Sequence, residues 1–128
     1  MRKALVFALL CAALSCGGNP SAPHSGPLAD GSWSGTGACL NVADACNMTV
    51  GCGHGVFPRP TIRDDGTFDV DGTYRIEVGP VSIDPPPPAH FNGSISGSTL
   101  TLTVTSGSSQ NTYKMQQTAV VVCGVRCV

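Results

Sequence analysis

Residues 67–78, TFDVDGTYRIEV, alternate between apolar and polar side chains with a period of two. This alternation suits a β-strand with one buried and one solvated face, because successive side chains of a strand point to opposite faces. Gly72 falls on the apolar side, which indicates a kink or bulge inside one long strand. A hairpin turning at Asp71-Gly72 is the competing interpretation.

The remaining chain after residue 30 repeats this pattern in short segments separated by turn residues. Residues 89–97 and 98–106 each place apolar side chains on one face, and Gly97-Ser98 between them has the form of a two-residue hairpin loop. Neither these segments nor the others show a capped apolar stripe of helical period. The sequence therefore predicts an all-β fold, a small antiparallel meander barrel or sandwich of about six to eight strands with a single core.

Four consecutive prolines, Pro85 to Pro88, interrupt the strand pattern. Proline has no N–H to donate to a β-ladder and its φ angle is fixed. The run therefore predicts a stiff polyproline connector between two strands.

The first fifteen residues have the features of an export signal. The basic MRK precedes an apolar run at 4–14 that is too short for a permanent membrane span. AALSC at 12–16 resembles a bacterial lipobox, in which the sulfur of the cysteine receives a diacylglycerol before cleavage. The resemblance implies that residues 1–15 are a lipoprotein signal peptide and that Cys16 becomes the lipid-modified N-terminus, with Gly17 favouring the outer membrane. An ordinary secretory leader is the alternative.

Beyond the leader, the composition indicates a tether and one domain. Residues 16–30 are rich in Gly, Pro and Ser, which is typical of a flexible tether. Residues 31–128 suffice for a single β domain but not for two. Once Arg2 and Lys3 leave with the leader, five basic side chains face eight acidic ones without a basic run, so we expect no nucleic-acid partner.

Export would place the cysteines in a compartment where disulfides persist. Cys11 leaves with the leader and Cys16 carries lipid, which leaves five disulfide candidates: Cys39, Cys46, Cys52, Cys123 and Cys127. A bridge from Cys52 to Cys123 or Cys127 would close a loop of about seventy residues and stabilise the fold by about 4 kcal/mol. Cys39 and Cys46 could then bridge locally, with one C-terminal cysteine left over.

The stretch VGCGHGVFPRP at 50–60 also admits a metal site. Cys52 and His54 are two residues apart and would share one face of a strand, where His90 could join them around zinc or copper. No CxxC pair or second Cys-His cluster accompanies them, so the disulfide explains more and we expect no cofactor. A nucleophilic Cys52 would need an orienting acid that the sequence does not offer.

Other catalytic patterns are equally weak. GSWSG places Trp33 where a nucleophile elbow needs serine. Asp69 and Asp71 match only part of a calcium loop and, as turn or solvent-face residues, do not form a glycosidase carboxylate pair. We therefore expect no enzyme.

Three motifs carry a family resemblance: a Cys-x-His-Gly turn at 52–55, Phe-x-Val-x-Gly-Thr-Tyr at 68–74 and Leu-Thr-Leu-Thr-Val at 100–104. On these motifs, residues 52–105 resemble an uncharacterised family of small bacterial secreted or lipid-anchored β proteins. In that family a C-terminal cysteine tends to accompany the one in the Cys-x-His-Gly turn, which implies a bond from Cys52 to Cys127 or Cys123. The resemblance implies a β fold and a secreted or lipid-anchored location, and it implies no activity. GSWSG also resembles the Gly-x-Trp opening of lipocalins, over three residues.

Together these features predict a non-enzymatic, lipid-anchored cell-envelope protein with a structural or protein-interaction role. The N-terminal lipid would hold it at the outer membrane, facing the periplasm or the cell surface, beside an envelope protein partner. Two or more acyl chains on Cys16 suffice for stable anchoring. The alternative is a periplasmic β-barrel that binds a small ligand, or a metal through Cys52, His54 and His90.

Overall fold

The structure, a computed structural model, describes residues 25–35, 37–77 and 85–119. Its regular elements there are all strands: β1 (Gly26–Pro27), β2 (Gly31–Gly35), β3 (Ala38–Val42), β4 (Ala45–Val50), β5 (Gly53–Pro58), β6 (Thr61–Ile62), β7 (Thr67–Ile76), β8 (Pro88–Ser96), β9 (Thr99–Ser106) and β10 (Ser109–Thr118). In these ranges no helix is long and apolar enough to cross a membrane. The all-β prediction is confirmed.

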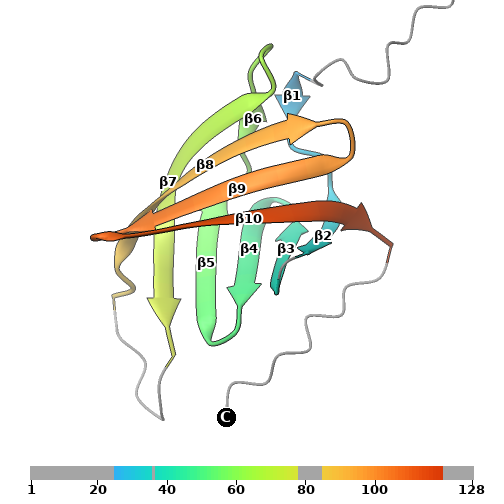
Figure 1. The fold of residues 1–128 in the computed structure, drawn as a ribbon. Helices are drawn as coiled ribbons and strands as arrows, with labels where there is room; N and C mark the ends of the chain where they lie inside the picture. The colour runs from blue at the N-terminus through green and yellow to red at the C-terminus, as the bar shows by residue number, and fades with distance from the viewer. Residues whose placement is uncertain (1–24, 36, 78–84, 120–128) are drawn as a thin grey trace, which may run out of the picture.

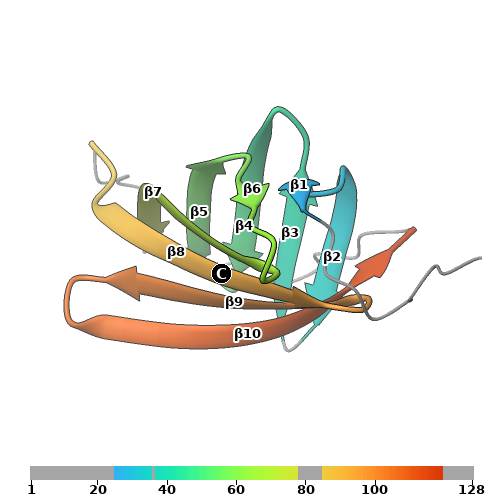
Figure 2. The ribbon, with the colours of Figure 1, turned by 90° about the horizontal axis from the view of Figure 1, so that it is seen from above.

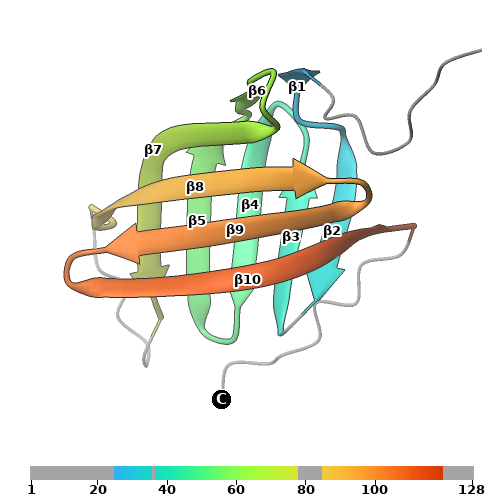
Figure 3. The same cartoon turned by 45° about the horizontal axis from the view of Figure 1, so that its top comes forward.

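Eight strands close into one antiparallel barrel in the order β10-β2-β3-β4-β5-β7-β8-β9. The barrel is thus an up-and-down meander in which successive barrel strands pair, β5 pairs with β7 because β6 lies outside the barrel, and β10 closes the ring on β2. Strands β8, β9 and β10 cross steeply over β3, β4 and β5 (Figures 1 and 3). Of the two expected architectures, the chain adopts the barrel.

The long strand β7 turns a corner between the two crossing sets of strands (Figure 3). Its residues 67–73 pair with β8, and its residues 73–76 pair with β5. Gly72 lies at this change of partner, where a Cβ atom would overlap the carbonyl oxygen of Val56 and crowd Phe57. The interpretation of Gly72 as a kink inside one strand is confirmed, and the hairpin at Asp71-Gly72 does not occur.

The other turns follow the sequence pattern closely. Gly97-Ser98 joins β8 to β9 with Ser96 opposite Thr99, as expected, and Gly97 has the positive φ of 59° that such a loop requires. The proline run gives way to strand at its last member, because Pro88 begins β8 opposite Thr73. A proline at the first position of a strand costs the ladder little, since its missing N–H lies at the edge of the pairing.

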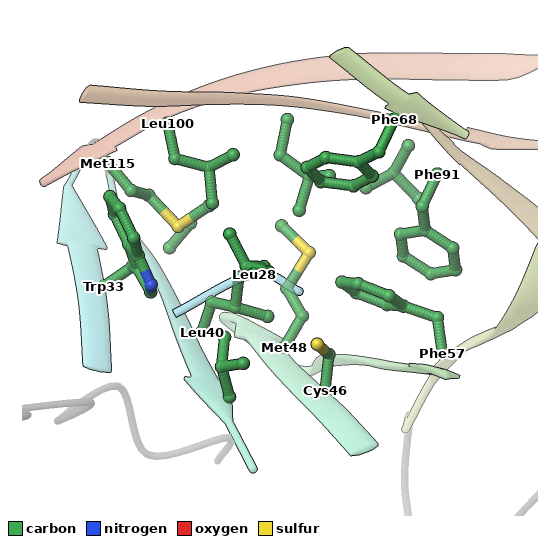
Figure 4. Packing of buried hydrophobic residues seen from close by; sticks show 14 of the residues in the cluster. Leu28, Trp33, Leu40, Cys46, Met48, Phe57, Phe68, Phe91, Leu100 and Met115 are labelled. Atoms are coloured by element: carbon green, nitrogen blue, oxygen red, sulfur yellow. The ribbon is translucent and has the colours of Figure 1, made fainter. Parts of the chain in front are cut away.

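The barrel interior is filled by the apolar faces of the strands. In β9, the inward-facing Leu100, Leu102 and Val104 are buried and alternate with half-buried threonines. On the other side of the interior, Phe57 and Phe91 stack with ring centroids 4.3 Å apart, and Phe68 lies close by (Figure 4). No buried residue in the described ranges is polar or charged, so hydrophobic burial is the main stabilising term of this core.

The folded part begins before the expected boundary at residue 31. Strands β1 and β6 form a separate two-stranded sheet that lies over one opening of the barrel (Figure 2). Leu28, which follows β1, is 1% exposed and belongs to the core cluster. The segment expected as tether therefore ends in a structured strap, residues 26–30. Residues 1–24, with the expected signal peptide and Cys16, lie outside the described residues.

Candidate functional site

The three residues of the metal alternative lie apart. His54 is on β5 opposite Arg75 of β7, whereas His90 is on β8 opposite Asp71 of β7. Those two positions of β7 are four residues, or about 13 Å, apart along the strand. Cys52 is disulfide-bonded and has no thiolate to offer a metal ion. The described part of the chain contains no cluster of three or more potential metal ligands.

The cysteines of the first half of the chain differ in state. Cys39 and Cys52 are disulfide-bonded, and Cys46 is a free, buried thiol. The expected local bridge between Cys39 and Cys46 is therefore wrong. The register explains why: Cys46 lies opposite Val42 of β3, three residues from Cys39, so the two cysteines point to opposite faces of the sheet. Cys123 and Cys127 lie outside the described residues.

The free thiol of Cys46 is expected to be unreactive in the folded protein. It points into the core with an exposed fraction of 0%, and burial raises its pKa to about 11, although the nearby Arg59 guanidinium lowers it. A cysteine reacts or binds metal as its thiolate. Cys46 is therefore a packing residue, neither a nucleophile nor a ligand.

A charged network that the sequence did not reveal crosses the outer face of β7 and β8. His90 Nδ1 lies 2.7 Å from Asp71 Oδ1, and His90 Nε2 lies 3.0 Å from Asp69 Oδ1. Arg63 Nη2 donates to Asp69 Oδ2 at 2.6 Å. The hydrogen bonds to Asp71 and Asp69 raise the pKa of His90, and those from Arg63 and His90 lower the pKa of Asp69. Only the strand register could have predicted this contact, because His90 is nineteen residues from Asp71.

This network links the neighbouring strands β7 and β8 through the side chains on their outer face. When His90 is protonated it can donate to both carboxylates at once, and in that form it can neither accept a proton nor bind a metal ion. The carboxylates of Asp69 and Asp71 are in turn occupied by His90 and Arg63. Their prediction as solvent-face acids agrees with the structure.

An apolar cleft of about 600 Å³ opens beneath the strap, at the end of the barrel covered by β1 and β6. Its walls come from four parts of the chain: Leu28 of the strap, Trp33 of β2, Ile62 of β6 and Ile95 of β8. Ser98 and Gln117 supply polar groups to the lining. A mostly apolar hollow with a few polar groups is the usual form of a small-ligand site.

Trp33, which lines this cleft, has a buried polar donor. The residue is 3% exposed, and its indole Nε1 has no hydrogen-bond partner among the described residues. A buried N–H without an acceptor costs about 1–3 kcal/mol, so such groups are rare in native proteins. The sequence singled out Trp33 only for its position in GSWSG and did not indicate the unpaired donor, because that depends on what packs around the ring.

The strap that covers the cleft is held by few contacts. Leu28 N donates to the carbonyl oxygen of Pro60 at 3.0 Å, and Arg59 Nε donates to the carbonyl oxygen of Leu28 at 2.7 Å. Arg59 also pairs with Asp30 at 2.9 Å. Gln117 Nε2 of β10 donates to the carbonyl oxygen of Asp30 at 3.3 Å, and β1 pairs with β6 over two residues. Such a segment can detach without opening the barrel ladder.

A second, smaller cleft of about 310 Å³ lies near the β9–β10 turn, at the opposite end of β9. Tyr74, Tyr113 and the exposed Ile76 line it. It contains no buried unpaired polar group that would point to a ligand among the residues that the structure describes.

Comparison of the chain with protein-family models, with curated proteins and with solved structures finds no match.

Proposed function

We propose that this protein is a non-enzymatic, lipid-anchored β-barrel of the bacterial cell envelope, with a structural or protein-contact role. Cys16 would carry the lipid, and the barrel would stand at the outer membrane on the tether that follows. The observation that carries the proposal is the oxidised state of Cys39 and Cys52, because disulfides persist in the compartments reached by exported proteins.

The register supports disulfides that reach to the C-terminal segment. Cys46 is free, and Cys39 and Cys52 are too far apart to bond with each other. Cys39 lies opposite Thr49 of β4, whereas Cys52 lies in the turn beyond Val50, toward β5. Strand spacing and rise put their Cα atoms about 10 Å apart, and a disulfide requires less than about 7 Å.

We propose Cys123 and Cys127 as the partners of Cys39 and Cys52, since Cys11 would leave with the signal peptide and Cys16 would carry lipid. Thr118, the last residue of β10, pairs with Ser32 of β2, the strand next to β3. Cys123 is five positions further along the chain, and five residue steps span up to about 17 Å, enough to reach Cys39. The resemblance-based expectation of a C-terminal partner for Cys52 fits this assignment. Both oxidised cysteines, Cys39 and Cys52, would then be bonded to the C-terminal segment, and Cys46 would be the odd thiol.

The packing of the barrel supports a non-enzymatic role for its interior. Large apolar side chains fill it, and a Cβ atom at Gly93 would overlap the Phe68 ring. A close-packed interior of this kind stabilises the fold and leaves the outer face to make contacts.

Mass spectrometry of the mature protein tests the anchor. We expect protein from the membrane fraction of a Gram-negative host to begin at Cys16 with lipid attached. Cys16→Ala should remove the lipid mass and release the protein, while Cys46→Ala should leave both unchanged. An unprocessed chain that keeps Met1 would contradict the proposal.

Thiol counting tests the disulfides on the same sample. One thiol should react after denaturation without reductant, and none within the assay time in the native protein. Because the thiol pKa is raised from 9.0 to about 11, the thiolate fraction of native Cys46 is about 100-fold lower than that of an ordinary cysteine at the same pH. Cys46→Ala should abolish the labelling. Three or more reactive thiols after denaturation would contradict the oxidised state.

A further inference from the structure

We propose that the cleft beneath the strap binds a small, uncharged acyl ester, whose chain lies on the apolar walls and whose carbonyl oxygen accepts a hydrogen bond from Trp33 Nε1. This binding site is independent of lipidation at Cys16 and of the disulfide partners. It extends the protein's role from scaffold to carrier or sensor of a lipid-like molecule.

The walls of the cleft set the apolar part of the ligand. Leu28, Ile62 and Ile95 present aliphatic side chains toward the same hollow, and the Trp33 ring contributes an aromatic wall. The volume of about 600 Å³ lies within the range of small-molecule pockets. An acyl chain would replace water against these walls and gain the free energy of apolar burial.

The charges around the cleft exclude an ionic ligand. None of the residues that line it carries a charge. In the strap, Arg59 is already paired with Asp30 at 2.9 Å, and Arg59 Nε donates to the carbonyl oxygen of Leu28. A carboxylate or ammonium in the cleft would lose its hydration without gaining a counter-charge.

The unpaired indole sets the polar part of the ligand. An indole N–H is a donor only, so its partner must be an acceptor. An ester carbonyl provides one strong acceptor oxygen and needs no donor in return, which matches a site with one buried donor. In Figure 4 the Trp33 ring lies at the edge of the core opposite the stacked phenylalanines, with its nitrogen on the side of Leu28 and Leu40.

Access to that nitrogen requires the strap to move. Trp33 Nε1 is shielded from solvent, and Leu28 is 1% exposed above the cleft. Entry of the ester would lift the strap enough to break the hydrogen bond from Leu28 N to Pro60, with Leu28 remaining as a wall of the cleft, while the eight-stranded ladder stays closed. Arg59→Ala, which removes two of the strap contacts, should therefore speed ligand association.

The single tryptophan of the chain makes the test direct, because it gives one indole N–H resonance in a ¹H–¹⁵N spectrum. The probes are methyl octanoate and, as the charged comparator, sodium octanoate. We expect methyl octanoate to move the Trp33 indole proton downfield, as a new hydrogen bond does. We also expect octanoate to bind at least 10-fold more weakly. No indole shift up to the solubility limit of the ester would overturn the proposal.

Two variants distinguish binding in this cleft from nonspecific hydrophobic binding to the protein surface. Ala29→Phe adds a ring at the exposed rim of the cleft and should abolish binding, while Val56→Phe, on the exposed outer face of β5, should bind as the wild type does. Trp33→Phe keeps an aromatic wall without the donor. Calorimetry should show that its affinity for methyl octanoate is about 5-fold lower than that of the wild type. An unchanged affinity of Ala29→Phe for methyl octanoate would overturn the proposed site, even if Trp33→Phe fails to fold.

Discussion

Around Phe57, Phe68 and Phe91 the barrel interior is closed by rings packed against backbone, whereas around Trp33 it is closed by a strap. In the first region a Cβ atom at Gly93 would overlap the Phe68 ring. In the second, a cleft of about 600 Å³ remains, and a buried N–H lacks an acceptor. Figure 4 shows the phenylalanines and Trp33 at opposite sides of one core.

The difference separates stability from function within a single small barrel. The phenylalanine region has the density of a protein interior and no room for a ligand. The Trp33 region gives up packing and one hydrogen bond, and its cover is joined to the barrel by a handful of contacts. Regions that open locally at low free energy are where binding sites are commonly found.

The largest expected effect tests the close packing of the phenylalanine region, around Phe57, Phe68 and Phe91. Gly93→Ala should destabilise the protein by about 3 kcal/mol or prevent folding, because the added methyl has to displace the Phe68 ring within a filled core. Denaturant unfolding measures the loss. Ser94→Ala, the neighbouring outward-facing position, should change stability by less than about 0.5 kcal/mol. A Gly93→Ala protein of wild-type stability would show that this region is not close-packed.

A matched pair of leucines compares the two regions directly. Leu100 in β9 and Leu28 in the strap are 0% and 1% exposed. Leu100→Ala should cost about 3 kcal/mol, within the usual range for a buried leucine. Leu28→Ala should cost only about 1 kcal/mol, because the strap can detach while the barrel ladder stays intact.

Tryptophan fluorescence supplies the second measurement on this pair. In Leu28→Ala the emission of Trp33 should shift to the red as water reaches the ring, and in Leu100→Ala it should not shift before global unfolding. Equal losses of stability with no emission change would mean that the strap is an integral part of the core.

The unpaired donor itself gives a smaller effect. Trp33→Phe should change the free energy of unfolding by no more than about 1 kcal/mol, because the lost ring volume is offset by removal of a buried N–H that costs about 1–3 kcal/mol. Phe91→Leu, which removes ring contacts and no polar group, should cost more. A loss of about 3 kcal/mol or more in Trp33→Phe would indicate that the indole N–H is already satisfied in the folded protein.

The fold was predictable from the sequence because its determinants are local. Alternation identified the buried faces of β8 and β9 and that of the first part of β7, but Ile76 at the end of β7 is 57% exposed although it falls on the apolar face. Gly97-Ser98 identified a hairpin turn whose φ angles only certain residues tolerate. The kink at Gly72 was also visible as a missing side chain on the apolar face. What the alternation did not provide was the reason for that kink, which is the passage of β7 from β8 to β5.

The candidate site was less predictable because it depends on register and on packing between distant segments. The predicted bridge between Cys39 and Cys46 is wrong because Cys46 lies opposite Val42, three residues from Cys39, and therefore on the other face of the sheet. Leu28 was assigned to the tether because one apolar residue among Gly, Pro and Ser carries no periodicity. The cleft brings together residues from positions 27 to 117, a combination that no sequence window contains.

The smallest expected effect concerns the charged network of His90, Asp69 and Asp71 on the outer face of β7 and β8. Hydrogen bonds to Asp71 and Asp69 raise the pKa of His90 above its ordinary value of 6.5. A group with a raised folded-state pKa stabilises the protein fully below its unfolded-state pKa, and this contribution is lost as the pH rises through the folded value. The lowered pKa of Asp69 acts in the opposite sense, with stabilisation lost only as the pH falls below the carboxyl range near 3.8.

The melting temperature of the wild type should therefore decline slightly from pH 6 to pH 8 relative to His90→Gln, and NMR titration should place the His90 pKa above 6.5. The difference should be small, because all three side chains are exposed and salt screens such pairs. Arg63→Gln serves as the control, since it weakens the network at Asp69 without removing the titrating ring. A large pH-dependent loss in His90→Gln would mean that charge on the outer face, rather than ring packing inside, closes this region of the barrel.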